Sequence, residues 1–347
     1  MGTYSYFVMK YEYVPIFYVR KNNYNIFITN TNEMSEKKER KMKKHGFLFK
    51  LKRYRTLLLM LLPSAILVFI FSYLPMGGLI LAFKKFNYAD GIFGSPWVGF
   101  DNFKFFFSSG KALSVTRNTA LYNIAFILIN NILEIAFAVI LSEMLGKVLK
   151  KLLQSVIFLP YFLSWVVVGS IAYSLLSYET GTINSLLDSL KLELINFYGE
   201  SSLWPFIIIV FNAWKSVGYG MVVYMAAILS VDPALHEAAA IDGANIFKRI
   251  RYITIPGIVP TIITLTLLAL GKVFRGNVDL FYQLVGQNGA LFNTTDVIDT
   301  YVFRMTISAT DIGQTVAIGF YQSVLCFITI IIANWFVKKK EESYSLF

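Results

Sequence analysis

The amino-acid sequence predicts an all-α integral membrane protein with six transmembrane helices. Hydrophobic residues make up 56% of the 347 residues and charged residues 15%, which is too apolar for an ordinary soluble domain. Six apolar segments are long enough to cross a bilayer, which takes about 20 residues. Lys and Arg gather beside these segments, so the formal net charge of +11 is interpreted as a topology signal rather than a sign of nucleic-acid binding.

The six predicted spans divide the chain at regular intervals. Several contain proline, which spanning helices tolerate when neighbouring helices satisfy the freed carbonyls. The first span is not a cleavable signal peptide, because its apolar stretch is too long and no small-residue cleavage site follows. The spans are predicted near 57–83, 118–145, 152–178, 203–230, 256–276 and 316–337.

Lys and Arg placement predicts the orientation of these spans. Cations crowd residues 37–55 before the first span, residues 147–151 in the second connection, and residues 338–340 after the last span. By the positive-inside rule, all three stretches are cytoplasmic, and so are both termini and the loop 231–256. The first outer loop conflicts with this orientation, because it also carries basic residues: Lys84, Lys85, Lys104, Lys111 and Arg117.

Residues 1–50 are predicted to be an N-terminal cytoplasmic leader, with one transmembrane domain over 51–347. The leader begins with a Tyr- and Asn-rich stretch without a clear period. It is either an interfacial segment or an upstream extension of a gene that starts at Met34 or Met42. The sequence MSEKKERKMKK from Met34 is typical of a cytoplasmic N-terminus and favours the second interpretation. We expect residues 1 to about 40 to be dispensable and poorly ordered.

Motifs for catalysis and metal binding are incomplete in this sequence. His236-Glu237 begins an HExxH pattern, but Ala240 stands where the second histidine belongs. No GxxxxGK[ST] loop occurs, so the chain has no recognisable means of binding ATP phosphates. The single cysteine, Cys326, lies in an apolar run and is expected to pack there. The sequence therefore predicts no metal site, no cofactor and no enzymatic activity.

The loop 231–256 carries the stretch HEAAAIDGANIFKRI, and its residues predict a short helix followed by a sharp turn. Asp232 is a suitable N-cap and Pro233 fits the first helical turn. Gly243 permits a left-handed turn, so a second helix can leave at an angle. Small side chains leave a surface that another protein can approach closely, at Ala238, Ala239 and Ala244. A Glu-Ala-Ala run alone would favour the alternative, an ordinary helix-turn-helix connector.

Three motifs together resemble a known family. Glu237-Ala238-Ala239, Asp242-Gly243-Ala244, Phe247, Ile253 and Ile255-Pro256 resemble the EAA loop of ABC-importer permeases. WVGFDNF at 97–103 resembles the outer-loop signature of carbohydrate-uptake permeases similar to the maltose permease. DVIDTYV at 296–302 is similar to the subgroup that handles oligosaccharides and polysaccharide fragments. The likeness covers residues 50–340. It departs at Lys248, where glutamine is frequent, and at Ile250, where an aromatic residue is frequent.

This resemblance implies a type I ABC-importer permease fold and a multi-pass protein of the bacterial plasma membrane. The chain would form an oligosaccharide pathway with a second homologous permease and receive the sugar from an extracellular binding protein. Two ATPase subunits would hold ATP and Mg²⁺, so no cofactor is expected in this chain. The residues implied to couple to the ATPases are Glu237, Ala238, Ala239, Asp242, Gly243 and Ala244.

Polar residues within the spans are the candidates for the sugar path, because polar groups in spanning helices usually face the bundle interior or a wet cavity. Asn130, Asn131 and Glu134 lie in the second span, and Gln322 in the sixth. Counting back from Glu237, as the similar maltose permease suggests, gives Asn212, Lys215, Ser216 and Tyr219, which recur at helical spacing and would share one face. Counting forward gives Asn277, and Trp214 is a further candidate in the fourth span. Such side chains also hydrogen-bond across packed helices, which is the alternative. The sugar site could equally lie in the second permease.

Two other functions remain as alternatives. An ABC permease for a non-sugar substrate, such as a peptide, would share most of these features. An ion-coupled transporter working alone would have paired intramembrane acids and inverted repeats. Glu134 is the one clear mid-span acid, and no such repeat is evident in the sequence.

Overall fold

The computed structural model describes residues 53–308 and 311–346, and the predicted leader lies outside them. Within the described residues the chain is helical, and an isolated bridge between Lys84 and Trp97 stands in place of any strand. The chain divides into two units, residues 1–76 and 77–347, which are described separately.

The described part of the first unit is an apolar helical segment. α3 (Arg55–Val68) continues into the π-helical turn η1 (Phe69–Tyr73), and η2 (Leu74–Phe83) extends the same stretch into the second unit. Together they form a candidate span over Arg55–Phe83, which matches the predicted first span. No side chain of α3 is buried, as expected for an apolar helix that meets lipid or another chain.

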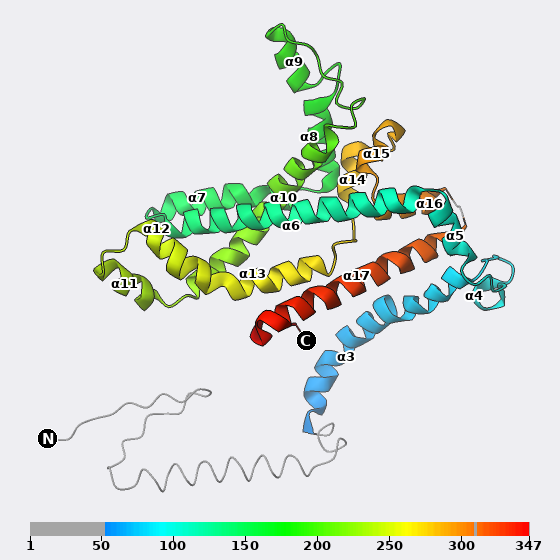
Figure 1. The fold of residues 1–347 in the computed structure, drawn as a ribbon, viewed down its shortest axis with the longest axis horizontal. Helices are drawn as coiled ribbons and strands as arrows, with labels where there is room; N and C mark the ends of the chain where they lie inside the picture. Colours follow the sequence, from blue (N-terminus) through cyan, green and yellow to red (C-terminus); the bar gives the residue numbers. More distant parts are fainter. Residues whose placement is uncertain (1–52, 309–310, 347) are drawn as a thin grey trace. The chain divides into compact units, whose positions relative to one another are not determined.

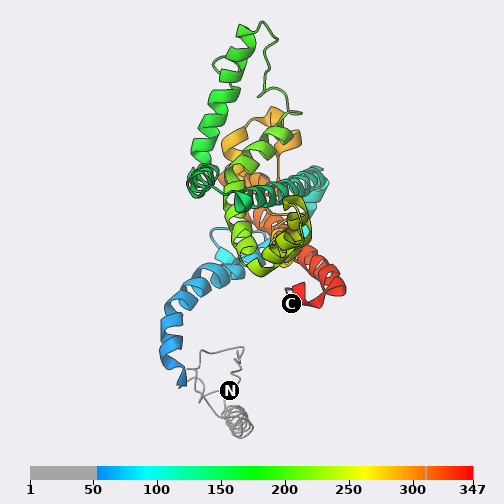
Figure 2. The ribbon, with the colours of Figure 1, turned by 90° about the vertical axis from the view of Figure 1, so that its left-hand side faces the viewer.

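Three long helices dominate the second unit and match the predicted second, fourth and sixth spans. They are α6 (Lys111–Glu143), α10 (Trp204–Leu229) and α17 (Ile312–Lys340). α6 packs against α10, and Figures 1 and 2 show the two helices crossing in the middle of this unit. Met221, Tyr224 and Ile258 are among the buried residues where α10 meets α6 and α13.

The third predicted span, 152–178, coincides with a bent pair of helices and not with one straight helix. α7 (Lys147–Phe158) and the 3₁₀ turn η3 (Leu159–Phe162) meet α8 (Trp165–Leu176) at an angle of 98°. Pro160 lies in η3, and Leu163 and Ser164 are extended, so the helical hydrogen bonding stops there. The described residues therefore hold five candidate spans, or six if the bent pair counts as one.

The fifth span also differs from its predicted bounds, 256–276. The helical segment begins ten residues earlier, at Ile246, and ends at Leu270. It comprises α12 (Ile246–Arg249), the π-helical turn η4 (Ile250–Thr254) and α13 (Ile255–Leu270). Residues 271–277 leave the helix before α14 (Val278–Val285) and are called the α13–α14 linker below.

Short helices surround the start of α6 and the start of α17. α5 (Asp101–Ser108) and α16 (Ile298–Ile307) pack there around buried Phe106 and Ile318 (Figure 1). A second core joins α8, α10 and α14 around Trp204. The remaining short elements are α4 (Gly91–Gly94), α9 (Thr182–Ser189), η5 (Gly289–Leu291), α15 (Phe292–Thr295) and η6 (Glu342–Tyr344).

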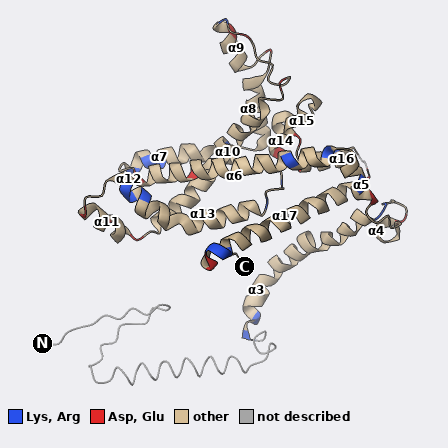
Figure 3. Cartoon of the chain, viewed as in Figure 1, with Lys and Arg blue, Asp and Glu red and all other residues tan. Residues whose placement is uncertain are grey.

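Basic residues gather at particular helix ends. Figure 3 shows them at the start of α7, in α12 and in the last turn of α17. Lys84, from the first predicted outer loop, is 3% exposed. Its Nζ donates to the carbonyls of Ile92 and Phe93 at 3.1 and 2.7 Å. Lys84 conflicted with the predicted orientation, but it is buried and hydrogen-bonded and is therefore not a free surface charge.

Candidate functional site

A polar cleft of about 620 Å³ opens between α6, α10, α13 and the α13–α14 linker. This volume lies within the range of small-molecule sites. Amide, tyrosine and charged side chains line it beside apolar residues. The polar lining residues are Asn123, Asn130, Asn131 and Glu134 of α6, Asn212 and Tyr219 of α10, Lys272, Arg275 and Asn277 of the linker, and Asp279 of α14.

The α6 wall holds the polar residues that the sequence placed in the second span. The Tyr224 hydroxyl donates to Asn131 Oδ1 at 2.6 Å, and Asn131 Nδ2 reaches Thr266 Oγ1 at 3.5 Å. Asn131 thus joins α6 to both α10 and α13. Asn130 Oδ1 has no hydrogen-bond partner among the described residues. Asn131 accordingly has a structural role, whereas the acceptor oxygen of Asn130 is unused.

Glu134 lines the cleft beside Gly220 of α10. A Cβ atom at Gly220 would overlap the Glu134 carboxyl group. The glycine therefore allows α10 to approach and leaves space for the carboxylate. Any larger residue at position 220 would push Glu134 out of its position or separate the two helices.

Of the six predicted path residues, three line the cleft and three do not. Asn212 and Tyr219 line the cleft, as does Asn277 across from them. Tyr219 is 52% exposed, and its ring stacks on that of Tyr161 with 5.0 Å between centroids. One face of the Tyr219 ring is thus held by η3.

The other three predicted residues, Trp214, Lys215 and Ser216, do not line the cleft. Lys215 Nζ donates to the carbonyl of Tyr161 at 2.8 Å and lies 5.3 Å from the centroid of the Trp165 ring. It stabilises the bend between α7 and α8, because its ammonium satisfies a carbonyl released where the helix stops. Trp214 packs edge-on against Phe211.

Side chains from three other helices support the α13–α14 linker. Asp299 Oδ2 accepts the N–H of Gly276 at 2.5 Å and the amide of Gln322 at 2.6 Å. Gln322 also donates to the carbonyl of Phe274 at 2.7 Å, and Asn123 donates to that of Arg275 at 3.1 Å. Non-helical backbone at membrane depth requires such partners. Gln322, a predicted path candidate, therefore holds the linker and does not line the cleft.

Burial raises the pKa of the Asp299 carboxyl group above its usual value. The hydrogen bonds from Gly276 and Gln322 and the charge of Arg275 act in the opposite direction. The Asp299 carboxyl group thus holds the linker by accepting hydrogen bonds from a backbone N–H and from a side-chain amide.

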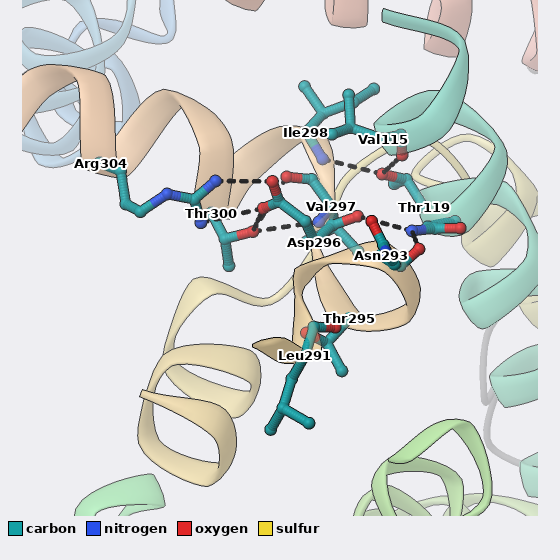
Figure 4. A network of polar contacts seen from close by, with 11 residues as sticks. Val115, Thr119, Leu291, Asn293, Thr295, Asp296, Val297, Ile298, Thr300 and Arg304 are labelled. Atoms are coloured by element: carbon teal, nitrogen blue, oxygen red, sulfur yellow. Dashed lines mark hydrogen bonds and ion pairs between the residues drawn. The ribbon is translucent and has the colours of Figure 1, made fainter. Parts of the chain in front are cut away.

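The DVIDTYV motif explains how the linker end of the cleft is positioned (Figure 4). Asp296 accepts two hydrogen bonds from Arg304, at 3.0 and 2.6 Å, and a third from Thr300 at 2.7 Å. Thr119 Oγ1 of α6 accepts the N–H of Ile298 at 2.9 Å. The first acid of the motif is part of the joint between α16 and α6, and the second acid, Asp299, holds the linker.

The WVGFDNF motif has a structural role in the second unit. Asn102 is buried, and its Nδ2 donates to the carbonyls of Leu81, Ala82 and Lys84 at 3.3, 2.9 and 2.9 Å. Trp97 lies over the Lys84 ammonium at 5.1 Å. The motif thus satisfies the carbonyls at the end of η2 and encloses a cation.

The loop 231–256 forms the predicted helix and turn. α11 spans Pro233–Ile241, and the Asp232 carboxylate accepts the N–H of Ala234 at 2.9 Å. Gly243 has φ +77°, a left-handed conformation that side-chain-bearing residues rarely adopt. Asn245 then caps α12, so a second helical segment leaves from the turn.

α11 and α12, on either side of the turn, each present an exposed apolar side chain. Ile241 is 87% exposed and Phe247 77% exposed. Glu237 is exposed too, and within residues 53–308 and 311–346 it forms no ion pair. Behind this surface, Arg249 of α12 meets Glu143 at the end of α6 with 3.7 Å between nitrogen and oxygen. The element is exposed on one side and anchored to the helix bundle on the other.

Comparisons with known proteins define the class of this chain. The sequence profile described as binding-protein-dependent transport system inner membrane component matches residues 134–342. Protein LplB of Bacillus subtilis is 35% identical over 84% of this chain and 91% of LplB. The polygalacturonan/rhamnogalacturonan transport system permease protein YteP of the same organism is 31% identical over 86% of this chain and 93% of YteP.

A solved structure has the same fold. The bacterial ABC transporter involved in the import of the acidic polysaccharide alginate aligns with a TM-score of 0.77 and 33% identity, over 85% of this chain and 99% of that chain. Fold, spans and relatives together define a multi-pass membrane permease of the ABC type, which is a transport subunit and not an enzyme. The chain belongs to the family of binding-protein-dependent transport system inner membrane components.

Four polar or charged lining residues of the cleft were missed by the sequence analysis: Asn123, Lys272, Arg275 and Asp279. The signal for the linker was present. Gly271 and Gly276 flank Lys272 and Arg275 within the predicted fifth span. Glycines and cations interrupting an apolar segment indicate a broken helix of the kind that forms transporter binding sites.

Proposed function

We propose that this chain is the permease subunit of an ATP-driven oligosaccharide importer, and that the polar cleft is part of the sugar path. The observation that carries this proposal is the combination of amides with an exposed tyrosine ring in one cleft. Sugar hydroxyls need both donors and acceptors, and the apolar faces of sugar rings pack on aromatic rings. The names of YteP and of the alginate transporter, both carriers of polysaccharide material, support the same substrate class.

In this proposal the bent pair α7–α8 is the third of six spans in a type I importer fold, and both termini are cytoplasmic. The cations at 147–151, in α12 and at 338–340 support this orientation under the positive-inside rule. The loop with α11 then lies on the cytoplasmic side. The exposed apolar side chains of α3 would meet lipid and a second, homologous permease.

α11 would serve as the coupling helix, seated in a cleft of one of two ATPase subunits that hold ATP and Mg²⁺. Glu237, Ala238, Ala239, Asp242, Gly243 and Ala244 would form the docking element, beside the exposed Ile241 and Phe247. α12, η4 and α13 form one continuous helical segment, and α13 lines the cleft through Leu265 and Ala269. Movement of α11 by an ATPase would therefore reach the cleft through a single rigid segment.

An extracellular binding protein would deliver the sugar. One of the similar structures is the alginate transporter in complex with an alginate pentasaccharide-bound periplasmic protein, with a TM-score of 0.76 and 32% identity over 84% of this chain and 97% of that chain. Substrate and ATP would each bind one state of the permease better than the other, which is the requirement for switching between outward and inward access.

The test of the function is uptake into proteoliposomes that contain the complete complex, with the binding protein outside and ATP inside. The panel holds neutral oligosaccharides, acidic oligosaccharides and oligopeptides of matched size. We expect ATP-dependent accumulation of an oligosaccharide and none with a non-hydrolysable ATP analogue. Accumulation of peptides alone, or uptake driven by an ion gradient without ATP, would overturn the proposal.

The coupling role has a separate test. Gly243→Pro cannot adopt φ +77°, and Glu237→Lys reverses the charge of the exposed acid. Both variants should insert normally, yet recover less ATPase on affinity purification or lose substrate-stimulated ATP hydrolysis, with the larger loss for Gly243→Pro. Normal recovery of the ATPase and normal stimulation of ATP hydrolysis in both variants would show that α11 is only a connector.

A further inference from the structure

The α13–α14 linker places two cations, Lys272 and Arg275, in the cleft. Both side chains are exposed, and within the described residues neither forms an ion pair. Three other basic residues of the second unit have partners: Lys84 and Lys215 bind carbonyls, and Arg304 binds Asp296. A cation near a spanning segment is costly unless it faces water or a binding partner. The two linker cations face the open cleft, where water or a bound ligand can be their partner.

The backbone that carries these cations is held in place. The N–H of Gly276 and the carbonyls of Phe274 and Arg275 are all bound by side chains of other helices. A Cβ atom at Gly276 would come within 3.0 Å of both Val297 and Asp299, so the linker packs closely against α16. Ligand binding would not have to order this segment, which favours affinity.

The carboxylates near the cleft do not neutralise the linker. Asp299 feels the charge of Arg275, but it does not line the cleft. Glu134 lines the cleft 11 positions along α6 from Asn123, whose amide contacts the linker. At 1.5 Å per residue the two positions are about 16 Å apart along the helix. Asp279 is the one exposed carboxylate among the lining residues at the linker end, against two cations.

We propose that the linker end of the cleft binds the carboxylate groups of an anionic oligosaccharide, one built from uronic acids, through Lys272 and Arg275. This proposal rests on the proposed sugar-import function and names its substrate class. An arginine fork can hold both oxygens of a carboxylate, and a lysine adds a mobile point charge. Asn212 and Tyr219 on the opposite wall would bind the hydroxyls and ring face of the same sugar.

The experiment compares charged sugars with uncharged counterparts of similar size. Equilibrium dialysis measures binding to the purified permease–ATPase complex, with the binding protein omitted because it selects substrates itself. The probes are radiolabelled trigalacturonate and trimannuronate, each beside its fully methyl-esterified form, and the neutral sugar cellotriose. We expect the wild-type complex to bind at least one charged probe with a Kd about tenfold or more below that of its ester.

The matched variants locate this preference. Lys272→Gln and Arg275→Gln should each raise the Kd of the charged probe about tenfold and leave the Kd of the ester unchanged. Arg275→Lys should fall between Arg275→Gln and wild type, because it keeps the charge and loses the fork. Lys111→Gln, at an exposed cation outside the cleft, should change neither Kd.

Three results would overturn the substrate class. If the glutamine variants raised the Kd of the charged and the esterified probes equally, Lys272 and Arg275 would not be binding the carboxylate. Loss of the partner permease from the purified glutamine variants would assign the cations to acidic residues of that partner. Binding of cellotriose without any charged probe would exclude an anionic substrate and leave sugar import intact, whereas uptake of peptides alone in the proteoliposome panel would remove the sugar function itself.

Discussion

The backbone leaves helical structure at the α7–α8 bend and in the α13–α14 linker, and the two places are stabilised in different ways. Each releases backbone groups from helical hydrogen bonding, and each is satisfied by side chains of another helix. At the bend, Lys215 of α10 supplies the donor and is itself 9% exposed. At the linker, Asp299 and Gln322 supply the partners from outside the cleft.

This difference shows that a broken helix is not by itself a binding site. The bend is occupied by the residue that stabilises it, because Lys215 donates to the Tyr161 carbonyl, lies beside the Trp165 ring and does not line the cleft. Asp299 and Gln322 support the linker from outside the cleft, and Asn123 supports it from within by donating to the Arg275 carbonyl. The side chains of Lys272 and Arg275 are not used in this support and remain available in the cleft, whereas Asn277 Oδ1 caps α14. The position of the supporting side chains decides whether an interruption can bind a substrate.

The largest effect is expected at the support of the linker. Asp299→Ala removes the acceptor of both the Gly276 N–H and the Gln322 amide. Each unsatisfied buried group costs about 1–3 kcal/mol, so the linker should shift and uptake should fall about tenfold or more. Asp299→Asn keeps one acceptor oxygen and should lose less. Initial uptake rates in proteoliposomes measure this, and wild-type rates for Asp299→Ala would contradict the proposed support.

Tyr219 links the two regions, because it lines the cleft and stacks on Tyr161 beside the bend. Tyr219→Ala removes a ring face worth about 0.5–1.5 kcal/mol, so the half-saturating sugar concentration should rise severalfold. Tyr219→Phe keeps the ring and should stay near wild type. Asn212→Ala should also weaken uptake, whereas Trp214→Ala, outside the cleft, should not. Complex recovery serves as the control for folding, and an effect confined to Trp214→Ala would move the site.

The smallest effect is expected at the bend. Lys215→Met removes the donor to the Tyr161 carbonyl but also removes a buried charge. These two contributions oppose each other, so stability should change by about 1 kcal/mol or less. The matched variant Lys151→Met, at an exposed residue of α7, should have no effect. Melting temperatures of the purified complexes test this, and a selective loss of sugar affinity in Lys215→Met would return Lys215 to the sugar path.

Local signals allowed prediction of some features, and others depended on tertiary contacts. The cap at Asp232 and the turn at Gly243 follow rules that operate within a few residues, and both are present. Long apolar runs likewise located α6, α10 and α17. The bend near Ser164 and the linker were missed. Hydropathy averaged over an apolar segment does not show where side chains of another helix replace the helical hydrogen bonds of the backbone.

The candidate site shows the same limit residue by residue. Helical spacing placed Lys215 near Asn212 and Tyr219, but its long side chain turns to the carbonyl of Tyr161. Gln322 is polar and lies within a span, yet it supports the linker instead of lining the cleft. Spacing along a helix predicts a shared face, whereas the direction of a side chain depends on the partners that surround it.

The most direct test of the sugar path is cysteine labelling in the reconstituted complex. Cys326→Ser removes the single native cysteine, and Asn277→Cys or Trp214→Cys then places one thiol in the cleft or outside it. A polar thiol reagent is applied with and without the transported oligosaccharide. If the cleft carries the sugar, the substrate should slow labelling at position 277 and leave position 214 unchanged. Protection at position 214 alone, or at neither position, would contradict a sugar path through this cleft.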